Sequence, residues 1–202
     1  MPLALPSTAS LHTVLPDRNV GWNFMTHLVQ FEQWVPAPIE RVFLFFANPG
    51  NLPRIMPPRT GTELVRLRLM PPPGIAAEPA TSVDRAPLAG VGSEIVTSFR
   101  LVPFLPFRAR WIALITEFEW NHHFADVQKK GPFKSFRHRH ELTGETRSQV
   151  KGTVIRDVIE YDVGWGVLGT LAQKLIVSRQ LQRTFQYRQK ALETLLAAQP
   201  VI

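Results

Sequence analysis

Residues 124–140 read FADVQKKGPFKSFRHRH, and this stretch carries the clearest structural signal in the chain. The Gly-Pro pair at 131–132 is typical of a turn, and the segments on both sides of it are strand-like. After the turn, Phe136, His138 and His140 share one strand face, because successive residues of a strand point to opposite sides. The pattern therefore predicts a strand whose inner face carries two histidines.

Working outward from this stretch, alternation and turn signals divide much of the chain into strands. The predicted strands are 28–35, 62–69, 93–101, 107–119, 122–128, 133–143 and 149–161. Within 133–143 the charged residues Arg137, Arg139 and Glu141 alternate with the histidines and are expected to point outward. Most of these strands are neighbours in hairpins, so the predicted sheet is antiparallel.

Helical periodicity occurs in two parts of the chain. The apolar residues of 39–46 recur at i, i+3, i+4 and i+7 until the Asn-Pro-Gly sequence at 48–50, and a short second turn covers 52–55. The segment 167–198 has no proline or glycine after Gly169, and its apolar residues form an irregular helical face. Four basic residues are assigned to much of its polar face: Arg179, Arg183, Arg188 and Lys190.

This order of elements predicts an α+β fold in one domain. We expect a curved antiparallel β-sheet of six to seven strands, two short helices after the first strand, and a long C-terminal α-helix packed on the concave face. Residues 1–27 show neither period and are predicted to be an irregular leader, so the domain spans 28–199. Residues 70–92, rich in Pro, Ala and Gly, are predicted to be a flexible loop insertion.

Composition restricts the classes of function. The chain has 202 residues, 45% of them hydrophobic, and a net charge of +7. It has no cysteine, which excludes disulfides and thiolate chemistry. No secretory signal or transmembrane-length apolar run is visible, so a soluble, cytoplasmic protein is expected. The basic residues form no block of five or more, so the charge is interpreted as dispersed over the surface, and no nucleic-acid partner is expected.

Four groups of residues resemble the START-like superfamily, also known as SRPBCC or birch-pollen-allergen-like. The resemblance is closest to its bacterial ligand-binding branch, which is grouped with polyketide cyclases and dehydratases. The groups are Pro36-Ala37-Pro38 with the apolar residues of 42–46, Asn51-Leu52 and Met56-Pro57; Gly92 through 99–101 to Pro106 and Trp111; the stretch 124–140; and Thr153, Asp157 and Tyr161 continuing through Gly166 and Gly169. Together they cover about residues 28–196. The family position of Phe136 is commonly a tryptophan.

The resemblance implies a helix-grip fold, in which an incomplete barrel surrounds the last helix. It also implies an elongated internal cavity for a lipid, sterol, polyketide or similar molecule. It does not imply one chemistry, because this fold is used by carriers, sensors and enzymes alike.

The two inner-face histidines are the main candidates for polar chemistry. In a cavity, His138 and His140 could accept a ligand hydrogen bond or act as acid and base near neutral pH. Alternatively they satisfy buried partners such as Asp126, Asp157 or Tyr161. Asp157 is flanked by apolar residues, so we expect it to be paired and to fix a histidine tautomer; a catalytic role remains an alternative.

No metal and no cofactor is expected from the sequence. A His-x-His pair on a strand can chelate a metal ion, but it would need carboxylates from other strands, and the sequence does not place any beside it.

The candidate ligand-binding residues combine this polar group with apolar side chains, each of which is either cavity wall or plain core. They are Phe43, Phe46, Phe99, Trp111, Trp120, Phe124, Phe136, His138, His140, Ile155, Asp157, Tyr161, Leu171 and Leu175. Residues 104–107, Phe-Leu-Pro-Phe, are predicted at a hairpin tip that gates the cavity, touches a membrane or packs on the domain.

Three functions remain open at this point. The favoured one is carriage or sensing of a small hydrophobic molecule, since it requires only a cavity. The first alternative is a cyclase- or dehydratase-type enzyme acting on such a molecule through His and Asp acid–base residues. The second is a basic module that docks on an anionic membrane or on nucleic acid. Transient membrane contact is compatible with the favoured function, because a positive charge favours an anionic surface.

Overall fold

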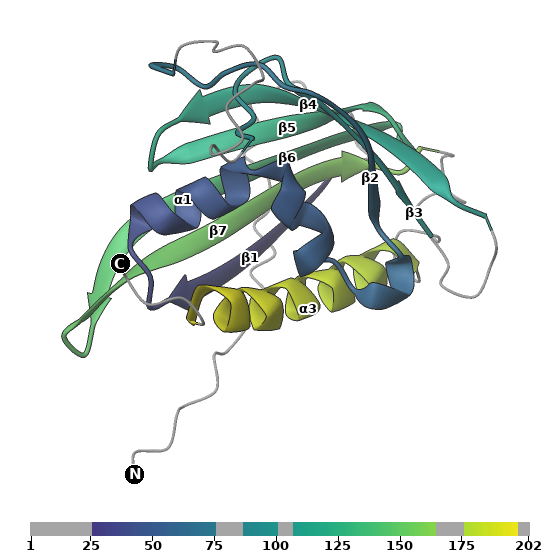
Figure 1. The fold of residues 1–202 in the computed structure, drawn as a ribbon. Helices are drawn as coiled ribbons and strands as arrows, with labels where there is room; N and C mark the ends of the chain where they lie inside the picture. Colours follow the sequence, from purple (N-terminus) through teal and green to yellow (C-terminus); the bar gives the residue numbers. More distant parts are fainter. Residues whose placement is uncertain (1–25, 76–86, 101–106, 165–175, 198–202) are drawn as a thin grey trace, which may run out of the picture.

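The computed structural model describes residues 26–75, 87–100, 107–164 and 176–197 of the chain. These residues form one curved sheet with helices on its concave side (Figure 1). The sequence predicted this α+β arrangement, and the structure confirms it.

Seven antiparallel strands make up the sheet, in the order β1-β7-β6-β5-β4-β3-β2. Their bounds are β1 His27–Val35, β2 Glu63–Arg68, β3 Glu94–Phe99, β4 Ala109–Glu119, β5 His123–Lys130, β6 Ser135–Arg147 and β7 Val150–Asp162. Strands β2 to β7 are sequential neighbours, whereas β1 pairs with the last strand, β7. This pairing places β1 and β7, the first and last strands along the sequence, side by side. Strand β1 also contacts the C-terminal helix α3.

Four helical elements accompany the sheet among the described residues. They are α1 Ile39–Ala47, the 3₁₀ helices η1 Pro49–Ile55 and η2 Pro58–Thr60, and α3 Ser178–Ala197. The side chain of Asn48 begins η1 by accepting a hydrogen bond of 2.8 Å from Gly50 N, so the Asn-Pro-Gly sequence ends one helix and starts the next. Helix α3 crosses the open side of the sheet and contacts β1 and η1 (Figure 1). Its predicted start near Val167 lies outside the described residues.

The turn between β5 and β6 explains the sequence pattern around residue 131. The side chain of Gln128 donates to Phe133 O at 2.8 Å and accepts from Phe133 N at 3.2 Å. A Cβ atom on Gly131 would lie only 2.3 Å from Gln128 Oε1, so any larger residue there would displace the Gln128 side chain from these two hydrogen bonds. The turn thereby fixes the register in which Asp126 of β5 lies opposite His138 of β6.

The described ends of the predicted 70–92 insertion pack against the domain. Gly90 N donates to Met70 O at 2.8 Å, Ala89 N donates to Ala47 O at 2.9 Å, and the Trp120 indole donates to Pro73 O at 2.8 Å. Ala89 is buried. The insertion therefore begins and ends in fixed contacts, while residues 76–86 lie outside the described part.

The core under the sheet forms two hydrophobic clusters. The α1 cluster consists of Val35, Ala37, Val42, Phe43, Ala47, Ile55, Phe124, Leu142, Ile155, Leu192 and Leu196. The Phe31 cluster consists of Phe31, Ile159, Tyr161 and Phe185. In the Phe31 cluster the rings of Phe31 and Phe185 stack with centroids 4.2 Å apart, which attaches α3 to β1.

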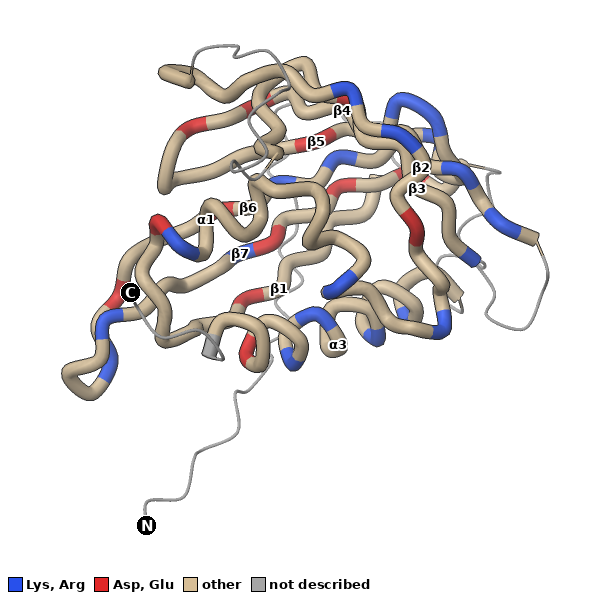
Figure 2. The backbone as a smooth tube through the Cα atoms, viewed as in Figure 1, with Lys and Arg blue, Asp and Glu red and all other residues tan. Residues whose placement is uncertain are grey.

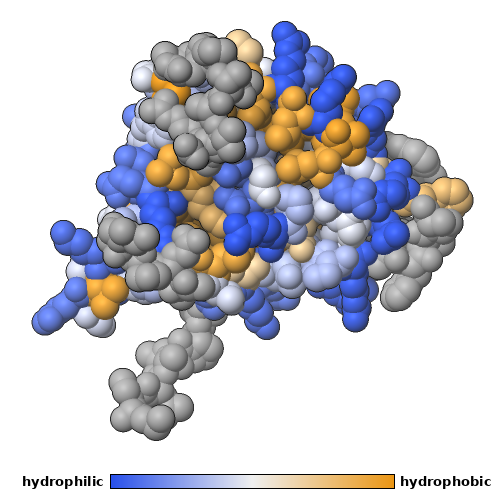
Figure 3. Space-filling model, in the orientation of Figure 1, coloured by the Kyte–Doolittle hydropathy of each residue, from blue (hydrophilic) through white to orange (hydrophobic). Residues whose placement is uncertain are grey.

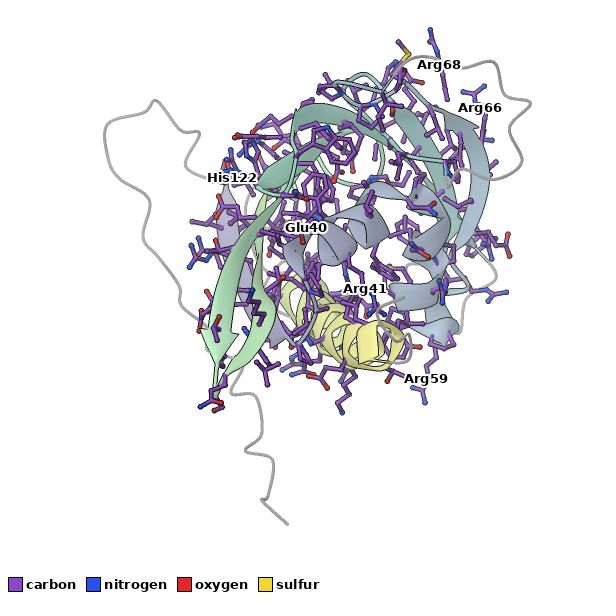
Figure 4. All side chains as sticks on the ribbon, turned by 60° about the vertical axis from the view of Figure 1, so that its left-hand side comes forward. Glu40, Arg41, Arg59, Arg66, Arg68 and His122 are labelled. Carbon is purple, nitrogen blue, oxygen red and sulfur yellow. The ribbon has the colours of Figure 1, made fainter. Side chains whose placement is uncertain are left out.

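Charged side chains occupy the outer face of the sheet, as the alternation predicted. Glu117 accepts from Arg137 at 2.6 Å and from Arg139 at 2.8 Å, and Arg137 also pairs with Glu160 at 2.9 Å. The remaining basic residues are scattered over several elements (Figure 2). Arg66 and Arg68 project from the sheet at its β2 edge (Figure 4).

Candidate functional site

A cavity of about 530 Å³ lies between the concave face of the sheet and the helices η1 and α3. Its size is typical of a small-molecule site, which usually occupies about 300–1,000 Å³. Aromatic rings from β3, β4 and β6 and from the β5–β6 turn form one wall: Phe99, Trp111, Phe136 and Phe133. Trp111 packs edge-on against Phe136, with ring centroids 4.7 Å apart. The wall is therefore a continuous apolar surface.

A polar layer separates the two hydrophobic clusters. We use this name for six residues: Gln33, Asp126, His138, His140, Asp157 and Arg188. On each of β1, β6, β7 and α3, the layer lies between a residue of the α1 cluster and a residue that packs in the Phe31 cluster. On β7, for example, Asp157 lies between Ile155 and Ile159. Asp126, His138, His140 and Arg188 line the cavity.

The centre of the polar layer is a carboxylate shared by two imidazoles. Oδ1 of Asp157 lies 2.9 Å from Nε2 of His138 and 2.6 Å from Nδ1 of His140. All three residues are buried. An ionised carboxylate only accepts hydrogen bonds, so His138 carries its proton on Nε2 and keeps a lone pair on Nδ1. Nδ1 of His140 approaches the same oxygen but makes no hydrogen bond in the described structure.

Burial decides the charge of this group. Burial lowers the pKa of His138 to about 4, and the neighbouring His140 adds to this effect. Burial likewise lowers the pKa of His140, although the charge of Asp157 opposes it. Burial alone would raise the pKa of Asp157, but His140 and His138 outweigh it and hold that pKa well below its usual range. At neutral pH, therefore, Asp157 is the anion and both imidazoles are neutral.

Asp126 brings a second carboxylate to the cavity. The β5–β6 register places it directly opposite His138. Burial raises its pKa, with the charges of His138 and Arg188 opposing the effect. A carboxyl group at this position can accept a hydrogen bond from a bound molecule.

Arg188 lies on the inner side of α3, so the prediction that it belongs to the polar face of this helix is wrong. It is 7% exposed. It lies three residues after Phe185 and four before Leu192, a spacing that places all three on one helical face. Its guanidinium carbon is 4.7 Å from the centroid of the Phe185 ring. Arg179, Arg183 and Lys190 are exposed, as predicted.

Among the residues that the structure describes, two groups of side chains have spacings that would suit a metal ion. One nitrogen each of His138 and His140 and one oxygen of Asp126 lie within 4.8 Å of one another. The same holds for Glu119, His122 and His123 at the turn after β4. The first group supplies the carboxylate that the sequence could not place next to the histidines.

The fourteen predicted site residues divide into four sets. Seven line the cavity: Phe46, Phe99, Trp111, Phe124, Phe136, His138 and His140. Phe43, Trp120, Ile155 and Tyr161 pack in or against the clusters instead of lining it, because neighbouring side chains cover them. Asp157 lies directly behind the histidines. Leu171 and Leu175 lie outside the described residues.

Several lining residues were missing from the predicted set. They include Leu52, Met56, Asp126, Thr184, Phe185 and Arg188. Helical spacing would have found Arg188, three residues after Phe185, and then Thr184, four residues before Arg188. Asp126 could have been found from its alternation with Phe124, which is buried. Which side chains of η1 line the cavity depends on how that helix folds back over the sheet, and no local sequence signal indicates how it does so.

Apolar side chains on the surface are interrupted by hydrophilic ones in the view of Figure 3. Phe107, at the start of the predicted hairpin arm, is 76% exposed, whereas residues 104–106 lie outside the described part. Among the described helices, none combines the length and apolar character needed to cross a bilayer.

Comparison with solved structures finds several with the same fold. The chain is similar to a START superfamily protein from Mycobacterium smegmatis (15% identity, TM-score 0.56, 85% of this chain and 97% of the other). It is also similar to a protein from Thermus thermophilus (20% identity, TM-score 0.52, 85% and 99%). A third is ginseng major latex-like protein 151 from Panax ginseng (11% identity, TM-score 0.53, 85% and 98%).

Sequence comparison adds no closer relationship, because no protein-family profile and no curated protein matches the chain. At identities of 11–20% the structural likeness shows the fold alone. The fold class predicted from the sequence is confirmed: the chain has the helix-grip fold of the START-like superfamily.

Proposed function

We propose that this protein binds one small, mostly apolar molecule, such as a lipid or polyketide, inside the cavity and acts as its carrier or sensor. The observation that carries the proposal is the cavity of about 530 Å³, which has an aromatic wall and a few polar side chains contributed by the polar layer. Pockets with this combination are the usual sites for small ligands, since apolar contact supplies affinity and the polar groups set orientation.

The fold supports the proposal in general terms. Helices α1, η1 and α3 all lie on the concave side of the sheet, so they can enclose a molecule there (Figure 1). The aromatic wall offers ring faces and edges over a wide area, which suits a chain or a fused-ring system equally.

Uptake of a neutral environment-sensitive dye tests the proposal. N-phenyl-1-naphthylamine should bind with a stoichiometry of one per chain and show the blue-shifted emission of an apolar site. Ala113 of β4 is buried and lines the cavity, so Ala113→Phe should reduce dye affinity about tenfold or more by occupying the space. Thr116 is exposed on the same strand, so Thr116→Phe serves as the matched control and should leave affinity unchanged.

The outcome is decisive only if the variants fold. Circular dichroism melts of both variants should match the wild type within a few degrees, and if Ala113→Phe unfolds, Ala113→Leu replaces it. No saturable dye uptake by the wild type, or equal uptake by folded wild type and Ala113 variant, would refute binding in the cavity.

A further inference from the structure

Arg188 is a buried cation that lines the cavity and has no ion pair among the described residues. Its Nε is buried without a hydrogen-bond partner in that part of the structure. The ring of Phe185 covers one face of the guanidinium, which stabilises it only partly. An arginine stays charged at neutral pH, so its burial must be compensated by a nearby negative group.

The carboxylates of the polar layer do not supply that partner directly. Asp157 is already engaged by His138 and His140 through one oxygen. Asp126 makes no ion pair with Arg188 in the described structure, and burial raises its pKa. Both still act on Arg188 over a longer range, because their charges raise its pKa while burial lowers it. The guanidinium donors that face the cavity therefore remain available to a bound molecule.

We propose that Arg188 binds the carboxylate head of an otherwise apolar ligand, whose chain or rings then lie along the wall formed by Trp111, Phe133 and Phe136. The planar guanidinium presents paired N–H donors that match a carboxylate. This inference rests on the proposed function, because it needs a ligand in the cavity. It names the class of that ligand as a monocarboxylate amphiphile.

The charge of the layer favours a monoanion over a dianion. Asp157 is negative and Arg188 is positive, so their charges sum to zero. A bound carboxylate brings the total to one negative charge, and a doubly charged phosphate would bring it to two. The guanidinium thereby gains the partner that the described residues do not give its Nε.

A second arginine, Arg100 at the end of β3, also lines the cavity and must be distinguished. It is only partly buried, so water can solvate it. The experiment therefore includes Arg100→Met next to Arg188→Met. Arg183, exposed on α3, provides the matched control Arg183→Met, which removes the same charge from the same helix.

Isothermal titration with three ligands of equal chain length measures the preference: dodecanoate, dodecanol and dodecylammonium, each below its micellar concentration at pH 7. Wild type and Arg183→Met should bind dodecanoate about tenfold or more tighter than dodecanol, with dodecylammonium weakest. Arg188→Met should lose that preference while still binding dodecanol, because methionine keeps the apolar wall. Arg188→Lys should retain part of it, since the charge remains but the paired geometry is lost.

The outcomes separate this inference from the proposed function. Equal binding of dodecanoate and dodecanol by the wild type overturns the inference and leaves the proposed function standing, whereas binding of none of the three counts against both. Loss of the preference in Arg100→Met instead of Arg188→Met also overturns it. If Arg188→Met fails to fold, NMR of carboxyl-¹³C dodecanoate on the wild type decides: a bound carboxyl pKa below that of the free acid supports the inference, and one equal to or above it contradicts it.

Discussion

Nε2 of His138 lies 2.9 Å from Oδ1 of Asp157, across two paired strands in the buried centre of the protein. The sequence predicted that at least one of the two inner-face histidines would reach Asp126, Asp157 or Tyr161, and this contact confirms it. The same oxygen also faces Nδ1 of His140 at 2.6 Å. One carboxylate thus orients His138 through a hydrogen bond, as carboxylates behind functional histidines commonly do, and it lies in close contact with His140.

Removing this carboxylate charge should weaken the fold. Asp157→Asn keeps the shape but places an amide against the two imidazoles and removes the negative charge that acts most strongly on Arg188. We expect a loss of about 2–3 kcal/mol in the free energy of unfolding, measured by urea denaturation. Glu145→Gln, which breaks an exposed pair with Arg147, is the control and should cost under about 0.5 kcal/mol. Equal small losses in both variants would contradict the central role of Asp157.

Stability should rise with pH between about 4 and 6.5 because of His138. Its pKa is 6.5 when unfolded and about 4 when folded, so in this window the unfolded chain binds more protons. The contribution is complete above pH 6.5 and is lost as the pH falls, by up to about 3 kcal/mol. His140, whose pKa is also lowered, acts in the same direction, whereas the raised pKa of Asp126 opposes both.

The His138→Gln variant isolates this effect. Urea denaturation at pH 4.5 and pH 7 should show a smaller stability difference than in the wild type. His122→Gln is the control for the substitution itself, since that side chain is 65% exposed and its replacement should cost under about 0.5 kcal/mol at pH 7. An unaltered slope in His138→Gln would show that the buried imidazole is not the titrating group.

The stacked pair of Phe31 and Phe185 should be a main anchor of α3. Both rings are buried, so Phe185→Ala removes a large apolar side chain and leaves a void, at an expected cost of about 3–5 kcal/mol in unfolding free energy. Hydrogen exchange should then accelerate in α3 more than in β5 and β6. Uniform acceleration throughout the sheet would mean that the helix and the sheet unfold as one unit.

Ligand affinity should grow with chain length until the cavity is filled. Burying each added CH₂ contributes about 0.8 kcal/mol, so Kd should fall roughly fourfold per methylene from octanol upward. Titration calorimetry should show a plateau at the length the cavity accommodates, and Ala113→Phe should move this plateau to shorter chains. A continuous increase with no plateau would indicate binding on an open surface.

The sheet could be predicted from the sequence because alternation and turn residues are local signals. The strand around residues 133–143 was predicted with the correct inner face, and Asp157 with the correct partners, since both follow from a period of two. The C-terminal helix gave a weaker signal. Arg188 was assigned to the polar face by its charge, although its spacing from Phe185 and Leu192 placed it on the inner face.

The division of apolar residues into wall and core could not be predicted in this way. Phe43 and Phe46 lie on the same helix and have the same chemistry, yet only Phe46 lines the cavity. Which ring is covered depends on how α1 and η1 sit over the sheet, and that is a property of the assembled fold. The pairing of Asp126 with His138 likewise depends on the register set by the Gln128 turn.

The most direct test of the central claim is a crystal structure of the protein grown with 12-bromododecanoate, with the bromine located by anomalous diffraction. A bromine peak is expected inside the cavity beside Trp111 and Phe136, with electron density for the ligand chain continuing toward the polar layer. Bromine found only on the outer surface, for example at the exposed Phe107, with the cavity empty of the molecule, would contradict it.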